Sequence, residues 1–113
     1  MTANMDDKIK MEIFNLQAEL CKSLSDPTRL MIIYELRGGM KSVGELSEQL
    51  KLKQSTTSQH LAVLRKAGMV IPHRQGSSVY YNLVTTKITS ACDIVRELIA
   101  EKLHRDQALT RVL

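Results

Sequence analysis

The sequence has few aromatic residues, and long apolar runs are missing. Its 113 residues include no Trp and a single Phe, so we expect an aliphatic, mostly helical core. No apolar run approaches the roughly 18 residues that a helix needs to span a bilayer, and the N-terminal MTANMDDKIK lacks the apolar centre of a signal peptide. The length suits one domain, residues 1–113. We expect a cytoplasmic protein without membrane contact.

Cysteine and histidine are scarce as well. Two cysteines, Cys21 and Cys92, lie far apart and form no CxxC pair, which excludes a disulfide scaffold and a zinc knuckle. The three histidines, His60, His73 and His104, accompany no glycine-rich loop or carboxylate pair, and catalysis needs such a positioned set. We therefore expect no enzyme, no metal and no cofactor.

Acidic residues are absent from a long central stretch. Residues 49–92 contain no Asp or Glu and carry a formal charge of +6, whereas the remaining 69 residues carry −2, which gives the net charge of +4. The basic residues of this stretch are Lys51, Lys53, Arg65, Lys66, Arg74 and Lys87. An acid-free basic segment is typical of a surface that binds phosphate groups.

The stretch 55–68 within this segment predicts a short amphipathic helix. Leu61, Leu64 and Gly68, with Ala67 beside them, recur at the spacing of one buried face, and Gly68 is expected to end the helix. Any of the four hydroxyl residues 55–58 can cap its start. The opposite face carries Thr56, Gln59, His60, Arg65 and Lys66. Such side chains suit the edges of DNA bases, although a solvated polar helix face is the alternative.

A second short helix is expected directly before it, over residues 42–50. Ser42 and Glu45 have the spacing of a capping box, and Val43, Leu46 and Leu50 share one face. The connection, residues 51–54, has room only for a tight turn. Together the two helices predict a helix-turn-helix, in which the second helix enters the major groove of DNA.

Two helices precede this pair and one ends the chain. Residues 5–24 form a long apolar stripe through Ile13, Leu16, Leu20 and Leu24. A helix over 27–37, with Asp26 as N-cap and Pro27 in its first turn, is expected to bury Leu30, Ile33, Tyr34 and Leu36. The last helix, from Lys87 to about His104, is apolar over so broad an arc that pairing with a symmetry mate is expected, and residues from Asp106 onward are expected to fray.

Between the helix-turn-helix and the last helix, the pattern becomes that of strands. Residues 69–72 and 78–84 are rich in β-formers, and residues 73–77 form a polar turn with a glycine. We expect a hairpin with Arg74 at its tip, where it reaches the DNA backbone or minor groove. A solvated loop arginine is the alternative. The fold class is thus mainly α with a small β-hairpin, a winged helix-turn-helix that dimerises through its first and last helices.

Four motifs, LCKSLSDPTRLMIIYEL, SVGELSEQL, QSTTSQHLAVLRKAGMV and GSSVYYNL, resemble the ArsR/SmtB family of winged-helix repressors. The resemblance implies a homodimer that binds double-stranded operator DNA and leaves it when a metal ion, metalloid or oxidant binds. It assigns DNA contact to Gln54, Ser55, Thr56, Ser58, Gln59 and His60, with wing contact by Arg74; the exposed Arg65 joins this candidate set. A winged-helix module that binds protein remains the alternative. It would be favoured if binding to DNA did not weaken steeply as salt rises.

The sensing residues of that family are where this sequence departs from it. Its metal-sensing members carry a cysteine pair within the helix that here reads GELSEQL, and Asp93 is followed by Val95 where other members have His. His104 is a lone histidine near the expected end of the last helix. Such a histidine is more often solvated and stabilised by the helix dipole than a metal ligand. The effector is therefore unknown. Cys21 and Cys92 are candidates for a thiol switch, with buried core thiols or a metalloid site across the dimer as alternatives.

Overall fold

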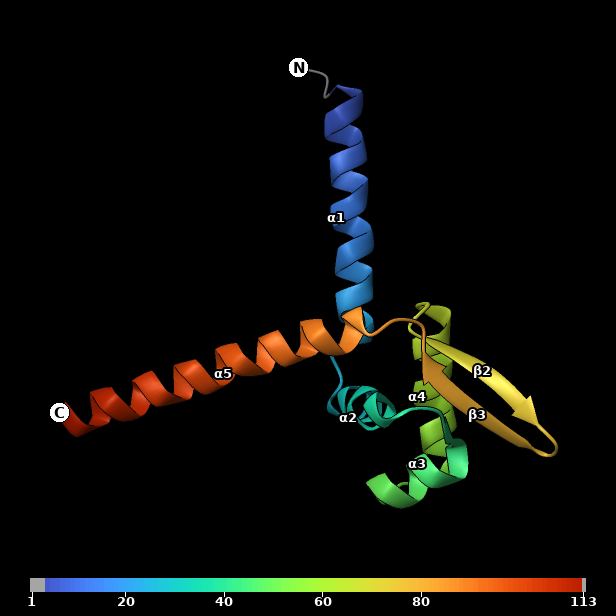
Figure 1. Ribbon diagram of the computed structural model, residues 1–113. Coiled ribbons are helices and arrows are strands. Elements are labelled where there is room, and N and C mark those ends of the chain that lie inside the picture. Colours follow the sequence, from blue (N-terminus) through green and yellow to red (C-terminus); the bar gives the residue numbers. More distant parts are fainter. Residues whose placement is uncertain (1–3, 113) are drawn as a thin grey trace.

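The computed structural model describes residues 4–112 as a mostly helical chain with a small sheet (Figure 1). The helices are α1 (Met5–Ser23), α2 (Pro27–Glu35), the 3-10 turn η1 (Leu36–Gly38), α3 (Val43–Leu50), α4 (Gln54–Lys66) and α5 (Lys87–Val112); the strands are β1 (Lys41–Ser42), β2 (Val70–Gln75) and β3 (Ser78–Leu83). This order confirms the predicted winged helix-turn-helix, with additions described below.

Side chains fix the starts of the helices, as their sequences predict. Asp26 Oδ1 accepts from the backbone N–H groups of Thr28 and Arg29 at 2.8 and 3.1 Å, and Pro27 follows as the first residue of α2. These bonds, led by the one from Arg29, lower the pKa of the Asp26 carboxyl. Ser42 and Glu45 form the expected capping box of α3. Each cap satisfies N–H groups that a helix start leaves unpaired.

The sheet has three strands in the order β1-β3-β2, and all pairs are antiparallel. β1 was not predicted, because two residues opposite Tyr80 and Tyr81 leave no period-2 pattern to read. The predicted turn 73–77 was wrong. β2 continues to Gln75, which pairs with Ser78, and only Gly76 and Ser77 connect the strands. Gly76 has φ +62°, the conformation that such a two-residue turn requires.

The core lies where α2, α3 and α4 meet the sheet. It consists of Ile32, Ile33, Leu36, Leu46, Leu61, Leu64, Met69, Val70 and Cys92. The predicted burial of Leu30 and Tyr34 was wrong for the single chain, since their side chains are 37% and 53% exposed, whereas Ile32 is fully buried. The nine-residue helix α2 has apolar residues on all sides, so its sequence does not define one buried face. Which side chains are buried depends on the elements that pack against it.

The last helix is longer than predicted. α5 continues through the expected end near His104 and the supposedly frayed residues from Asp106, and it reaches Val112. Residues 105–112 contain neither Gly nor Pro and include good helix formers. Nothing in the sequence therefore stops the helix at His104.

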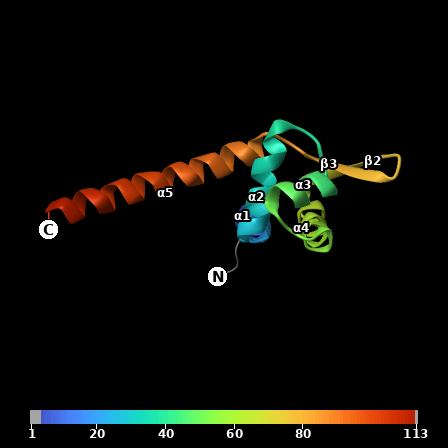
Figure 2. The ribbon, with the colours of Figure 1, turned by 90° about the horizontal axis from the view of Figure 1, so that it is seen from below.

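The two terminal helices leave the body as long arms (Figure 1), and α5 is seen extended in the second view as well (Figure 2). The radius of gyration is 18.2 Å, whereas a compact chain of this length has about 13 Å. α1 buries no residue of its own, and α5 contacts mainly α2. No described helix is long and apolar enough to cross a membrane. The arms thus expose their apolar sides.

Candidate nucleic-acid interface

The turn between α3 and α4 consists of Lys51, Leu52 and Lys53. Lys51 adopts φ +57°, the left-handed conformation, and its N–H donates to the last turn of α3. α4 begins at Gln54, one residue before the predicted start. None of the hydroxyl residues 55–58 caps it, because the N-cap is Lys53, which makes no side-chain cap bond. The first N–H groups of α4 therefore have no side-chain cap among residues 4–112.

A buried hydroxyl pair joins the two helices of the motif. Ser47 Oγ lies 2.8 Å from Thr57 Oγ1 and 2.7 Å from the Val43 carbonyl oxygen, and Thr57 Oγ1 lies 3.3 Å from the Lys53 carbonyl oxygen. Thr57 is fully buried and Ser47 nearly so. The sequence reasoning missed this contact. Its signal is that Thr57 lies four residues before Leu61, on the buried stripe of the helix.

The rest of the first turns of α4 faces solvent. Gln54, Ser55, Ser58 and Gln59 are exposed, as is Arg65 near the end of the helix. On the other side Leu61 and Leu64 are fully buried, as predicted. Gly68 has φ +79°, and the next N–H, that of Met69, returns to the Leu64 carbonyl oxygen at 2.9 Å, which confirms the predicted helix stop. α4 thus presents amides and hydroxyls outward.

Thr56 and His60 are placed differently from the other candidates. Both are half-buried. His60 Nδ1 lies 3.3 Å from Arg29 Nη1 and 3.9 Å from Asp26 Oδ1, and Arg29 Nε donates to the Ser23 carbonyl oxygen at 2.6 Å. His60 therefore connects α4 to the start of α2, with part of its ring in solvent.

The hairpin of β2 and β3 forms the wing beside α4. Arg74 lies on β2, opposite Val79, and is exposed, so it occupies a strand and not the tip of a loop. His73 Nε2 and Asn82 Oδ1, 2.7 Å apart, connect the strands. A ribbon whose side chains alternate between faces holds Arg74 more firmly than a flexible loop would.

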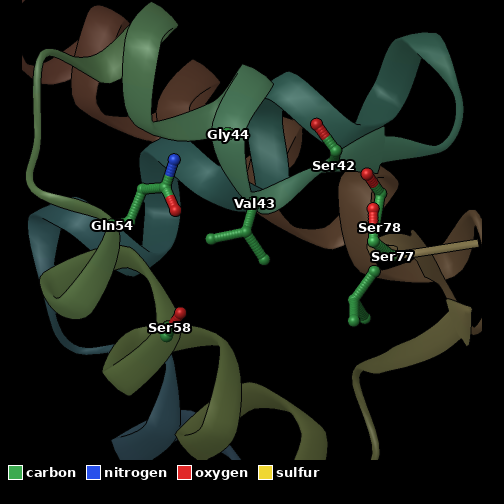
Figure 3. Close-up of a pocket in the computed structure, with 8 residues that line it drawn as sticks. Ser42, Val43, Gly44, Gln54, Ser58, Ser77 and Ser78 are labelled. Carbon is green, nitrogen blue, oxygen red and sulfur yellow. The ribbon is translucent and has the colours of Figure 1, made fainter.

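A polar hollow of about 350 Å³ separates the wing from the start of α4 (Figure 3). Its lining residues are Ser42, Val43, Gly44, Gln54, Ser58, Ser77, Ser78 and Val79. Gln54 and Ser58 lie on one side and Ser77 and Ser78 on the other (Figure 3). The lining contains hydrogen-bonding groups and no acid, so it does not repel a phosphate.

The two cysteines lie in different environments, and both are free thiols. Cys21, near the end of α1, is exposed, whereas Cys92 on α5 belongs to the core. Burial raises the pKa of the Cys92 thiol, although the nearby Arg96 opposes this effect. Among residues 4–112 no three His, Cys, Asp or Glu side chains lie close enough together to hold a metal ion.

Comparison with known proteins places this geometry in a family. Residues 26–71 match the bacterial regulatory proteins of the arsR family. The transcriptional activator HlyU of Vibrio cholerae is 37% identical over 82 residues, 73% of this chain and 76% of HlyU. The biofilm growth-associated repressor of Xylella fastidiosa is 44% identical over 73 residues, 65% of this chain and 64% of that protein.

A solved structure shares the fold. The solution structure of Mb0332 from Mycobacterium bovis, a homodimeric winged helix-turn-helix DNA-binding domain, superposes with a TM-score of 0.76 over 89% of this chain and 92% of Mb0332, at 24% identity. The fold match and the sequence relatives agree with the helix-turn-helix and wing described above. The chain therefore belongs to the ArsR family of bacterial winged helix-turn-helix transcriptional regulators.

Proposed function

We propose that the protein is a homodimeric repressor that binds double-stranded operator DNA through α4 and the wing, in the cytoplasm. One observation carries the proposal. The acid-free segment of residues 49–92 contains α4, the wing and five of the eight residues that line the polar hollow between them. Phosphate groups dominate the affinity of such surfaces for DNA, and carboxylates among the contacts would oppose it.

We assign two kinds of contact within this interface. The candidate amides and hydroxyls at the start of α4, all exposed except that of the half-buried Thr56, read base edges, since Gln can bond an adenine edge in two places and Ser or Thr can donate and accept. These residues are Gln54, Ser55, Thr56, Ser58 and Gln59. Arg65 and Arg74 bind phosphate, and the solvent-facing part of the His60 ring contacts the backbone. Phosphate contacts position the protein, and base contacts specify the sequence.

The arms supply the dimer contact in this proposal. Of the twenty large apolar side chains that are exposed among the described residues, thirteen lie on α1 and α5. Apolar patches of this extent mark interaction surfaces, and a two-fold axis places two reading helices on successive grooves of a palindromic site. Mb0332, which shares the fold, is homodimeric. Residues 1–113 then act as one DNA-reading domain with terminal dimerisation helices.

Repression is the simplest effect of such binding. In this proposal the bound protein acts by occupying the promoter. Relatives carry both names, activator for HlyU and repressor for the Xylella fastidiosa protein. The described residues hold no metal-binding cluster, and a metal effector is not part of this proposal.

The test begins with selection of an operator from random duplexes, followed by fluorescence anisotropy at several salt concentrations. We expect tight, sequence-dependent binding that weakens steeply as salt rises. Arg74→Ala should weaken binding to all sequences alike and lower the salt slope by about one unit. Arg105→Ala, which removes the same charge from exposed α5, is the matched control. Failure to enrich any sequence, with binding indifferent to salt, would favour the protein-binding alternative.

A further inference from the structure

A four-residue cluster connects the long arm α5 to the body of the protein. It consists of Asp93 and Arg96 on α5, Tyr34 on α2 and Arg37 in η1, and we call it the Asp93 cluster. Beyond α2 no element makes extensive contact with α5 among the described residues. Ile88 and Cys92 pack on the core just before the cluster. Residues 94–109 of α5 are all exposed, and the helix extends away from the body (Figure 1).

One carboxylate oxygen lies at the centre of the cluster. Asp93 Oδ1 accepts from Arg37 Nη1 at 2.8 Å and from Arg96 Nη2 on its own helix. The two guanidinium groups also lie near one ring, at 5.2 Å (Arg37) and 5.4 Å (Arg96) from the centroid of Tyr34. Cations at this distance are attracted to the face of an aromatic ring. Two contacts therefore join α5 to the α2–η1 segment: the ion pair of Asp93 with Arg37 and the contact of Arg96 with the Tyr34 ring.

The arrangement depends on the negative charge of Asp93. Two guanidinium groups against one ring repel each other, and the shared carboxylate offsets this repulsion. A single exposed ion pair contributes little to stability, and these side chains are between a third and a half exposed. A substitution within the cluster should therefore change the free energy of folding little, and its effect is expected in the direction of α5.

A small change at this point is large at the end of the arm. α5 runs on from Asp93 to Val112, so at 1.5 Å per residue the arm beyond the cluster is about 29 Å long. A tilt of about 10° at the cluster moves the end of the arm by about 5 Å, roughly one and a half base-pair steps of 3.4 Å. Because the proposed dimer forms through α1 and α5, the angle at the Asp93 cluster sets the distance between the two reading helices.

We propose that Asp93 is a positioning residue that holds Arg37 and Arg96 on Tyr34 and thereby sets the half-site spacing that the dimer prefers. This inference rests on the proposed function, because spacing has meaning only for a dimer on a two-part operator. Asp93 touches no DNA. It acts through the angle of α5.

The experiment measures binding to palindromic operators whose half-sites are moved apart by one base pair at a time through one turn, about 10 base pairs. We expect a sharp preference from the unaltered protein and a flattened profile from Asp93→Asn. Binding to a single half-site should be the same for both, which separates positioning from damage to the reading surface. Asp93→Glu, which keeps the charge, should restore the preference at least in part. Glu101→Gln, the same loss of charge farther along α5, is the matched control.

A second variant and a DNA-free measurement keep the test decisive. Arg37→Gln should flatten the profile as Asp93→Asn does, and the double variant should be no flatter, because both break one connection. Wing-to-wing distances, measured by electron paramagnetic resonance between nitroxide amino acids at Ser77, should spread more widely in either variant. A profile and a distance distribution as narrow as those of the unaltered protein would overturn the inference. If the unaltered protein bound no DNA sequence specifically, the proposed function would be refuted instead. The wing-to-wing distances would then still show whether Asp93 sets the direction of α5.

Discussion

At the scale of the residue, hydroxyl side chains on one helix, α4, have different structural roles. Ser55, Thr57 and Ser58 are neighbours in sequence, but Thr57 is fully buried against Ser47 while the two serines are exposed. The period of 3.6 residues per turn decides which hydroxyl faces the core. The sequence could predict that face for Leu61 and Leu64. It could not predict the contact of His60 with Arg29, because that contact joins residues 31 positions apart.

Gln59 provides the most direct test of base reading. Its side chain is exposed on α4, and an amide that bonds an adenine edge at two points discriminates strongly between bases. Gln59→Ala should weaken binding to the selected operator by about 1–3 kcal/mol and relax the preference at one position in each half-site. Competition with single-base operator variants measures this. Unchanged discrimination would show that another face of α4 reads the DNA.

Cys92 permits a test of the thiol-switch hypothesis at the residue itself. The thiolate is the reactive form, and burial raises the pKa of this thiol. In a Cys21→Ser background, iodoacetamide should therefore modify Cys92 slowly in the native protein and rapidly in urea. Mass spectrometry follows the reaction. Equal rates in both conditions would mean that Cys92 is accessible, and the thiol switch would gain support.

At the scale of the element, local chemistry predicted the boundaries that local chemistry determines. Helix ends lie within one or two residues of the expected positions where a local motif determines them. These motifs are Asp26 with Pro27 at the start of α2, Ser42 with Glu45 at the start of α3, and Gly68 after the end of α4. β1 and the full length of β2 were missed because pairing with β3 creates them. The Asp93 cluster was missed for the same reason, since Arg37 and Asp93 are 56 residues apart.

The hydroxyl pair of Ser47 and Thr57 joins α3 to α4. Thr57→Val keeps the shape of the side chain but removes the partner of Ser47, which can still donate to the Val43 carbonyl oxygen. We expect a loss of about 1–2 kcal/mol in the free energy of unfolding, near the lower end for a disrupted buried hydrogen bond. Urea denaturation followed by circular dichroism measures it. Thr56→Val is the control, because that half-buried hydroxyl makes no hydrogen bond to the described residues; equal losses would leave the pair without a special role.

At the scale of the whole molecule, the chain is a small body with two arms. The longest dimensions are 53 and 52 Å against a thickness of 22 Å, and the wing and the far end of α5 lie on opposite sides of the body (Figures 1 and 2). In proteins most of the stability of a helix comes from packing of its apolar face, and α1 buries no residue in the single chain. An extended, exposed α1 is therefore explained if a second copy covers it, and the proposed DNA-reading surface then stays free at the other side of the body.

Leu16 tests whether a second copy covers α1. Its side chain is 59% exposed in the single chain, so Leu16→Glu should leave the fold of the body intact. In the proposed dimer the substitution removes two buried leucines, which by symmetry costs about 3–6 kcal/mol at about 1.5–3 kcal/mol each. Sedimentation equilibrium should then show monomers at concentrations where the unaltered protein is a dimer, and operator affinity should fall towards that of a single half-site. Gln17→Glu adds the same charge to the neighbouring position as a control. If Leu16→Glu remained dimeric with full operator affinity, α1 would not be part of the interface, and α5 alone would have to hold the two reading helices together.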